Sequence, residues 1–198
     1  VVPVIVPTQQ HDLVPLLAEA RRQYASIEYR PGRVNALGQV ASAYEALGDF
    51  ASAFAAADSA IALARTLGMR QEEAGSLELL ASIHRSAGEP RKALAVYQQA
   101  ETINRELGLP VESGTDLRET ARIYLELGER EAARRRAEAA VQVHRDTDAG
   151  AERLIDLLFL AELDGDSVPH LVEARDLASR VGTASARAAV AVAEARLA

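Results

Sequence analysis

Two arginines have the type and spacing to bind an anionic group. Arg118 and Arg122 are four residues apart, so on a helix they lie on the same face, one turn from each other. Guanidinium groups at this spacing can hold a carboxylate or a phosphate through paired hydrogen bonds. The alternative is that Glu119 and Glu126 neutralise them as ordinary surface ion pairs, each worth well under about 1 kcal/mol.

The remaining reactive residue types do not predict catalysis or a metal site. The sequence has no cysteine, which excludes disulfides, thiol catalysis and cysteine metal ligands. His11, His144 and His170 are far apart and lack metal-ligand spacing. A phosphate-binding glycine loop and a nucleophile elbow are also missing. We therefore expect a protein that is not an enzyme, with no catalytic residue, no cofactor and no metal.

Charge argues against a nucleic-acid partner. The arginine run 134–136 resembles a phosphate-binding patch, but Glu129, Glu131 and Glu138 surround it and the net charge is −7. Such a charge disfavours general attraction to phosphates. We interpret the run as a solvated helix face.

The elements that must position these residues are set by a repeat of forty residues. Gly48, Gly88 and Gly128 are each followed by an acid and, five residues after the glycine, by an alanine. Leucines at 37, 77 and 117 share the interval, and His84 stands in a column with two tyrosines, at 44 and 124. Such self-similarity is typical of architectures in which each unit buries its apolar face against its neighbours. His84 is therefore expected to be a packed residue.

Each unit is predicted to contain a pair of helices. At about 100° per residue, the first helix separates a packing face from a mostly polar face. The packing face holds Leu37, Val40, Ala41, Tyr44 and Leu47, and the opposite face holds Asn35, Gln39, Ser42 and Ala46. Gly48 suits a left-handed helix end, and the acid after it favours the positive end of the next helix. Alanines on the second helix allow close backbone approach.

These features resemble the tetratricopeptide repeat. The family's unit has a large, a leucine-like and a small residue, then a tyrosine, a glycine and two alanines. These positions correspond, in this order, to Leu37, Val40, Ala41, Tyr44, Gly48, Ala53 and Ala60. The period of forty differs from the usual thirty-four, leucine replaces the first tryptophan, and the closing proline is missing. The longer period is similar to a variant met in many bacterial signalling proteins and regulators. HEAT-like repeats share the length but lack this signature.

The resemblance covers roughly residues 34–182 and implies an all-α fold, a right-handed solenoid of antiparallel helix pairs. We predict one domain with an extended apolar segment at 1–8. The solenoid is expected to comprise a half repeat at 9–32, repeats at 33–69, 70–109 and 110–149, a degenerate repeat at 150–182 and a terminal helix at 183–198. The apolar segment could dock in a groove, its own or a neighbour's, or be a leftover. The alanine-rich last helix, Ala184 to Leu197, suggests a piece of a longer protein, self-association or a plain capping helix.

In this family the first helix of each unit lines the concave side, so the resemblance implies partner-binding residues there. The candidates are Asn35, Gln39, Ser42, Glu78, Leu79, Ser82, Arg85, Arg118 and Arg122. In the degenerate unit Ile155, Phe159 and Leu163 could reach the same groove, although burial beneath the last helix explains them better. The chaperone-binding subset of the family uses lysines and asparagines to hold a terminal carboxylate. Asn35 is present but Lys92 is the single lysine, which argues against that activity.

The expected function is a protein interaction scaffold that binds a peptide or helix in its concave groove. The alternative is the sensory or regulatory arm of a larger bacterial signalling protein or transcription regulator. The sequence has no cysteine, no signal peptide and no apolar run as long as a membrane span. We therefore expect a cytoplasmic protein without a membrane partner. Arginine is much more abundant than lysine, which is typical of a high-GC bacterial genome.

Overall fold

A computed structural model describes residues 30–163 and 168–197 of the chain. These residues fall into two compact units, one extending to Val96 and the other beginning at Tyr97. Every secondary-structure element in the described residues is an α-helix, which confirms the predicted all-α class. The predictions for the apolar segment and for the half repeat up to residue 29, including the absence of a metal role for His11, lie outside the described residues.

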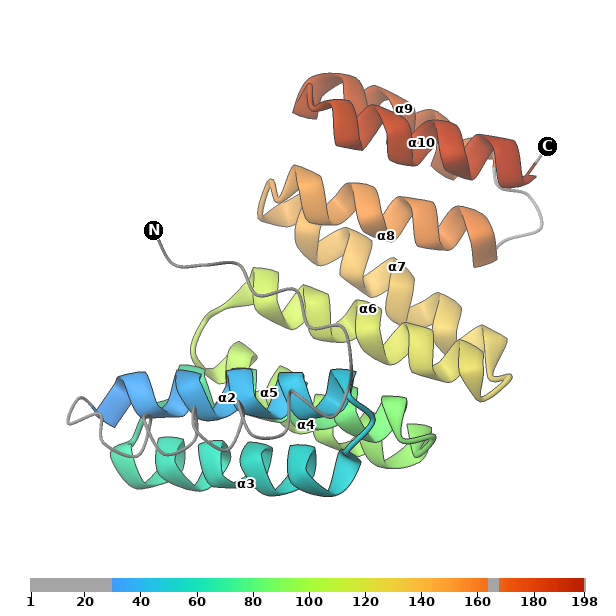
Figure 1. Cartoon of the computed structure of the whole chain (residues 1–198). Helices are drawn as coiled ribbons and strands as arrows, with labels where there is room; N and C mark the ends of the chain where they lie inside the picture. Colours follow the sequence, from blue (N-terminus) through green and yellow to red (C-terminus); the bar gives the residue numbers. More distant parts are fainter. Residues whose placement is uncertain (1–29, 164–167, 198) are drawn as a thin grey trace, which may run out of the picture. The chain divides into compact units, whose positions relative to one another are not determined.

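The first unit contains α2 (Arg30–Ala46), α3 (Phe50–Leu67), α4 (Arg70–Ser86) and the first half of α5 (Pro90–Glu106). In Figure 1, α2 and α3 run antiparallel as a pair, and α4 contacts both. The core between them contains Val40, Tyr44 and Ile83 with fully buried alanines at 41, 53 and 57. The alanines let the helix backbones approach closely, as the repeat columns predict.

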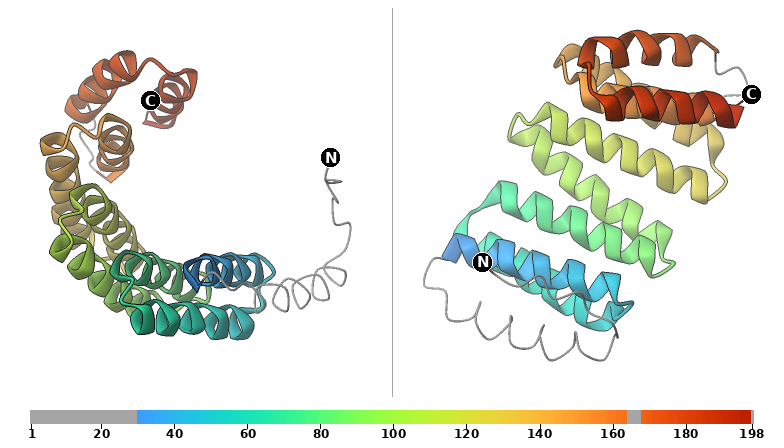
Figure 2. Two further views of the ribbon diagram at one scale, coloured as in Figure 1. Left: turned by 90° about the vertical axis from the view of Figure 1, so that its left-hand side faces the viewer. Right: turned by 45° about the horizontal axis from the view of Figure 1, so that its top comes forward.

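The second unit contains the rest of α5, then α6 (Pro110–Glu126), α7 (Arg130–Asp146), α8 (Gly150–Leu163), α9 (Val168–Val181) and α10 (Ala184–Leu197). Figures 1 and 2 show α8, α9 and α10 side by side. The bounds of α10 are those predicted for the last helix. Phe159 and Leu163 are buried in the core of this unit, whereas Ile155 is 41% exposed.

The repeat glycines end the first helices as predicted. Gly48, Gly88 and Gly128 have φ angles of 74°, 77° and 77°, in the left-handed region that glycine adopts without steric cost. After α2, the Asp49 N–H donates to the carbonyl of Tyr44 at 3.0 Å, which is the 6→1 bond of a Schellman motif. The Asp49 carboxylate then caps α3 by accepting from the Ser52 N–H at 3.2 Å.

The sequence was expected to contain no apolar run as long as a membrane span, and α3 departs from this expectation. Among the described helices it alone is long and apolar enough, by length and composition, to cross a membrane. Its apolar character comes largely from alanine, and its buried residues Ala53, Ala57, Ala60 and Ile61 contribute to the core of the first unit. The helix therefore also has the composition of a close-packed repeat helix.

Candidate functional site

A groove of about 560 Å³ lies along α2 and α4 in the first unit. It is lined by Val34, Asn35, Gly38, Gln39 and Ser42 from α2, and by Glu72, Gly75, Ser76 and Leu79 from α4. Four of the candidate residues, Asn35, Gln39, Ser42 and Leu79, therefore line one surface. The helical period places 35, 39 and 42 on one face of α2, as the sequence predicts.

Two glycines inside helices leave the groove open. A Cβ atom at Gly38 would lie 3.7 Å from the Leu79 side chain, and a Cβ atom at Gly75 would meet nothing within 4 Å. Neither glycine has the left-handed conformation that a turn requires. Glycine inside a helix costs about 1 kcal/mol relative to alanine. Backbone geometry therefore does not explain why glycine stands at these two positions. The absence of a side chain, which leaves the groove accessible, does explain it.

The other candidates on α4 do not line the groove. Ser82 donates a hydrogen bond to the Glu45 carboxylate at 2.9 Å, and Ser86 donates to the same oxygen at 2.7 Å. Ser82 thus connects α4 to α2. Glu78 and Arg85 are partly buried on α4 and outside the groove lining.

Glu72 is the ionisable side chain among the lining residues, and its neighbour Glu73 serves the fold instead. Glu73 is 5% exposed and forms ion pairs of 2.7 Å with both Arg65 and Arg70. Burial alone raises the pKa of Glu73, but hydrogen bonds from Arg65 and Arg70 outweigh it, so this pKa lies below its ordinary value. The two adjacent acids face different directions, and Glu72 gives the groove its negative charge.

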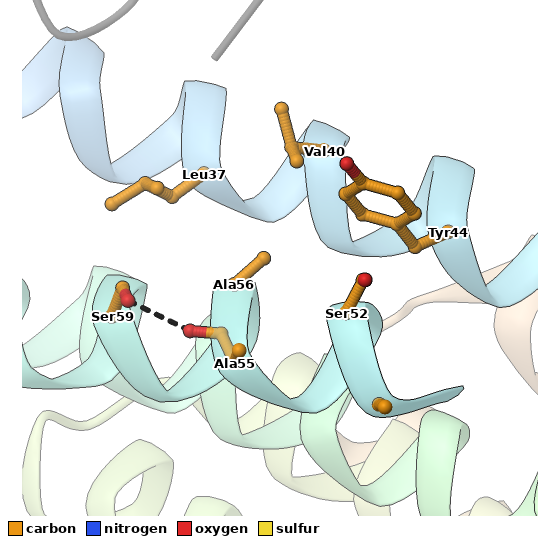
Figure 3. A pocket seen from close by; sticks show the side chains of 8 residues that line it. Leu37, Val40, Tyr44, Ser52, Ala55, Ala56 and Ser59 are labelled. Carbon is orange, nitrogen blue, oxygen red and sulfur yellow. Dashed lines mark hydrogen bonds between the residues drawn. The ribbon is translucent and has the colours of Figure 1, made fainter. Parts of the chain in front are cut away.

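A second hollow, of about 260 Å³, lies between α2 and α3 (Figure 3). Leu37, Val40 and Tyr44 point into it from α2, opposite small residues of α3. The Ser59 hydroxyl there donates to the Ala55 carbonyl at 2.7 Å. This is the predicted packing face of α2, on the other side of the helix from the groove. The groove is therefore the better candidate for binding a partner.

Arg118 and Arg122 do not form a two-pronged anion site. Arg118 is 6% exposed, and its guanidinium lies 3.0 Å from Asp156 and 2.9 Å from Glu152, both on α8. Arg122 extends over the ring of Phe159, 5.4 Å from its centroid. Burial alone lowers the pKa of Arg118, but the charge and hydrogen bonds of the two acids raise it above its ordinary value. The sequence places Arg118 on an open polar face, and the acids of α8 instead hold it inside the unit.

A buried polar pair recurs at the repeat interval in the second unit. The Asn104 amide donates to Asp116 at 2.9 Å, and His144 contacts Asp156 at 2.5 Å. Both contacts join residues twelve apart, and the second pair follows the first by forty residues. The sequence interpretation missed these columns, although polar residues recurring at the interval were the available signal.

His84 has a packing role in the first unit. His84 packs against Phe54, with ring centroids 4.6 Å apart, and its Nδ1 lies 2.7 Å from Glu89. The packed position expected from its tyrosine column is therefore confirmed. Across residues 30–163 and 168–197, no three side chains of histidine, aspartate or glutamate converge on a point where a metal ion could bind.

Comparison with known proteins agrees with the repeat geometry. The family model described as the tetratricopeptide repeat matches residues 32–106, which include most of α2 and all of α3, α4 and α5. This segment of the chain is similar to tetratricopeptide repeats. This match includes the whole groove between α2 and α4. No curated protein matches the chain.

Several solved structures resemble nearly the whole chain. Apo RapI aligns with a TM-score of 0.76 and 13% identity over 91% of this chain and 53% of its own. BtubC from P. vanneervenii aligns with a TM-score of 0.68 and 23% identity, over 96% of this chain and 84% of its own. A Rap protein complexed with Competence and Sporulation Factor aligns with a TM-score of 0.64 and 18% identity, over 96% and 58%. The fold is an all-α helical-repeat solenoid, and the chain spans about half the length of RapI.

Proposed function

We propose that this chain is a non-enzymatic interaction scaffold that holds a peptide or helix of a partner protein in the groove between α2 and α4. The observation that carries the proposal is the convergence of Asn35, Gln39, Ser42 and Leu79 on one groove. The tetratricopeptide repeats make a protein interaction scaffold the general class. The groove gives that class a specific surface.

The lining suits the main chain of a partner segment. Asn35 and Gln39 are exposed carboxamides one turn apart, and each can donate and accept hydrogen bonds with a peptide unit. Gly38 between them adds no side chain that would keep the partner away, and Leu79 offers an apolar contact. Because the groove is preformed on two packed helices, binding loses little entropy in ordering the scaffold.

A peptide selection tests this proposal. A random peptide library displayed on phage is selected against the full chain, and the enriched peptides are measured by titration calorimetry. Gly75→Leu fills the groove, since a side chain at this position meets open space. Ala62→Leu adds the same side chain at an exposed position of α3 outside the groove. We expect Gly75→Leu to weaken binding at least tenfold and Ala62→Leu to leave it unchanged. Failure to enrich any peptide, or equal affinities for the two variants, would refute the proposal.

The second candidate function is the regulatory arm of a larger signalling protein. The alignment of this chain with about half of RapI favours it. In that role, peptide binding would change how the repeats are arranged and so act on a fused domain. Small-angle scattering of the full chain with and without a selected peptide tests this, and an unchanged profile at saturation excludes it.

A further inference from the structure

His144 bridges three helices inside the second unit. It lies in the last turn of α7 and is fully buried. Its Nδ1 is 2.5 Å from a carboxylate oxygen of Asp156 on α8, and its Nε2 is 3.1 Å from the carbonyl oxygen of Val111 on α6. The ring therefore contacts a different helix at each nitrogen.

Both contacts require the histidine to donate. A backbone carbonyl oxygen can only accept a hydrogen bond, and so can an ionised carboxylate. The other carboxylate oxygen of Asp156 accepts from the Arg118 guanidinium at 3.0 Å, and arginine is charged at any ordinary pH. A neutral imidazole has one N–H and one lone pair, so either tautomer would direct a lone pair at an oxygen. With Asp156 ionised, only the doubly protonated ring donates to both partners.

We infer that His144 is held as an imidazolium at neutral pH, and that its second proton is a structural component joining the first turn of α6 to α7 and α8. Loss of this proton at alkaline pH removes one of the two contacts. The junction between the three helices is then weakened. The inference concerns the second unit and does not depend on what the groove of the first unit binds.

The surrounding charges support this state. Asp156 and Glu152 face the junction from α8, and Arg118 faces it from α6. On α7 itself the neighbouring Arg145 is exposed and pairs with Glu173 of α9. With His144 charged, two cations balance two anions.

These contacts also set the direction in which His144 titrates. Burial alone lowers the pKa of His144, and the charge of Arg118 lowers it further. The hydrogen bonds to Asp156 and Val111, with the Asp156 charge, outweigh both, so the pKa lies above its ordinary value of 6.5. The folded protein therefore keeps this proton to a higher pH than the unfolded chain does.

The chain contains a version of the same side-chain pair in which asparagine replaces histidine. Asn104 precedes His144 by forty residues and donates to Asp116 as His144 does to Asp156. An asparagine amide can donate at this position without titrating. His144→Asn is therefore a variant that retains a donor for Asp156 and removes the titrating proton.

Two measurements on the full chain test the inference. Because the folded pKa is raised, the stabilisation from the proton is complete below the unfolded pKa of about 6.5 and is lost as pH rises through the folded value. We expect the urea midpoint of wild type to fall between about pH 6 and about pH 9 more steeply than that of His144→Asn. The other three histidines are common to both proteins, so the difference between the two curves reports on position 144.

Nitrogen-15 NMR of the histidine rings in the wild-type chain gives an independent result. One ring is expected to show two protonated nitrogens at neutral pH, with exchange-protected N–H protons, and its signals are absent from His144→Asn. A neutral tautomer for His144 at neutral pH overturns the inference, and so do equal pH slopes for the two proteins. If His144→Asn fails to fold, the resonance is assigned by selective labelling, and its protonation state decides the matter.

Discussion

Gly114 lies against the His144 ring, and adding one methyl group there should destabilise the second unit. A Cβ atom at this position would be 2.5 Å from Nε2, 2.9 Å from Cε1 and 3.0 Å from Cδ2 of the ring. Real Cβ atoms essentially never approach other atoms below 3.0 Å, so Gly114→Ala forces the ring or α6 to move. The ring has little room to move because both of its nitrogens are hydrogen-bonded.

Two opposing effects set the size of the change. Overpacking a core by one methyl group costs about 1–3 kcal/mol, and the fixed ring places this site in the upper part of that range. Alanine recovers about 1 kcal/mol relative to glycine inside a helix. The expected net result for Gly114→Ala is a loss of about 1–2 kcal/mol in the free energy of unfolding.

Gly75→Ala is the matched control, since it makes the same substitution inside α4 where a Cβ atom meets nothing within 4 Å. This variant should gain about 0.5–1 kcal/mol. Urea denaturation followed by circular dichroism measures both variants against wild type. If Gly114→Ala is as stable as wild type, or gains as much as Gly75→Ala, the tight contact between α6 and His144 is refuted.

Three further outcomes are expected. The ion pairs of Glu73 stabilise the fold above pH 4.5, the pKa of this carboxyl in the unfolded chain, and this stabilisation is lost as pH falls through the lower pKa of the folded state. Acid should therefore lower the urea midpoint of wild type more than that of Glu73→Gln. Parallel pH dependences of the two midpoints would contradict this. Asp148 has a φ of 53°, so Asp148→Gly should raise the free energy of unfolding by about 1 kcal/mol, and a lowered value contradicts the strain. Val172 is 60% exposed on α9. If the terminal helices self-associate, Val172→Asp should reduce the association measured by sedimentation equilibrium. A wild-type chain that stays monomeric at high concentration would rule out self-association.

Much of the local structure could be predicted because the repeat fixes it locally. Gly48 and its equivalents end helices through a backbone conformation that depends on the residue itself, and the structure shows it. The polar face of α2 follows from helical period alone, so the sequence is enough to group Asn35, Gln39 and Ser42. These predictions needed only neighbours within about one or two turns.

Features that depend on contacts between helices could not be predicted in this way. Arg118 was expected on an open face, but Glu152 and Asp156 reach it from α8, where a shortened unit makes the phase hard to infer. Glu72 joins the groove because α4 packs beside α2. The pairing of His144 with Asp156 spans the turn between α7 and α8, and only the matching columns at 104 and 116 in the sequence indicate it.

The proposed role of the groove between α2 and α4 is to bind a segment of a partner protein. The most direct test is a crystal structure of the full chain with the tightest peptide from the library selection. We expect the peptide to lie in this groove, with main-chain hydrogen bonds to Asn35 and Gln39 and an apolar contact with Leu79. A peptide bound elsewhere on the chain, with the groove empty, would contradict it.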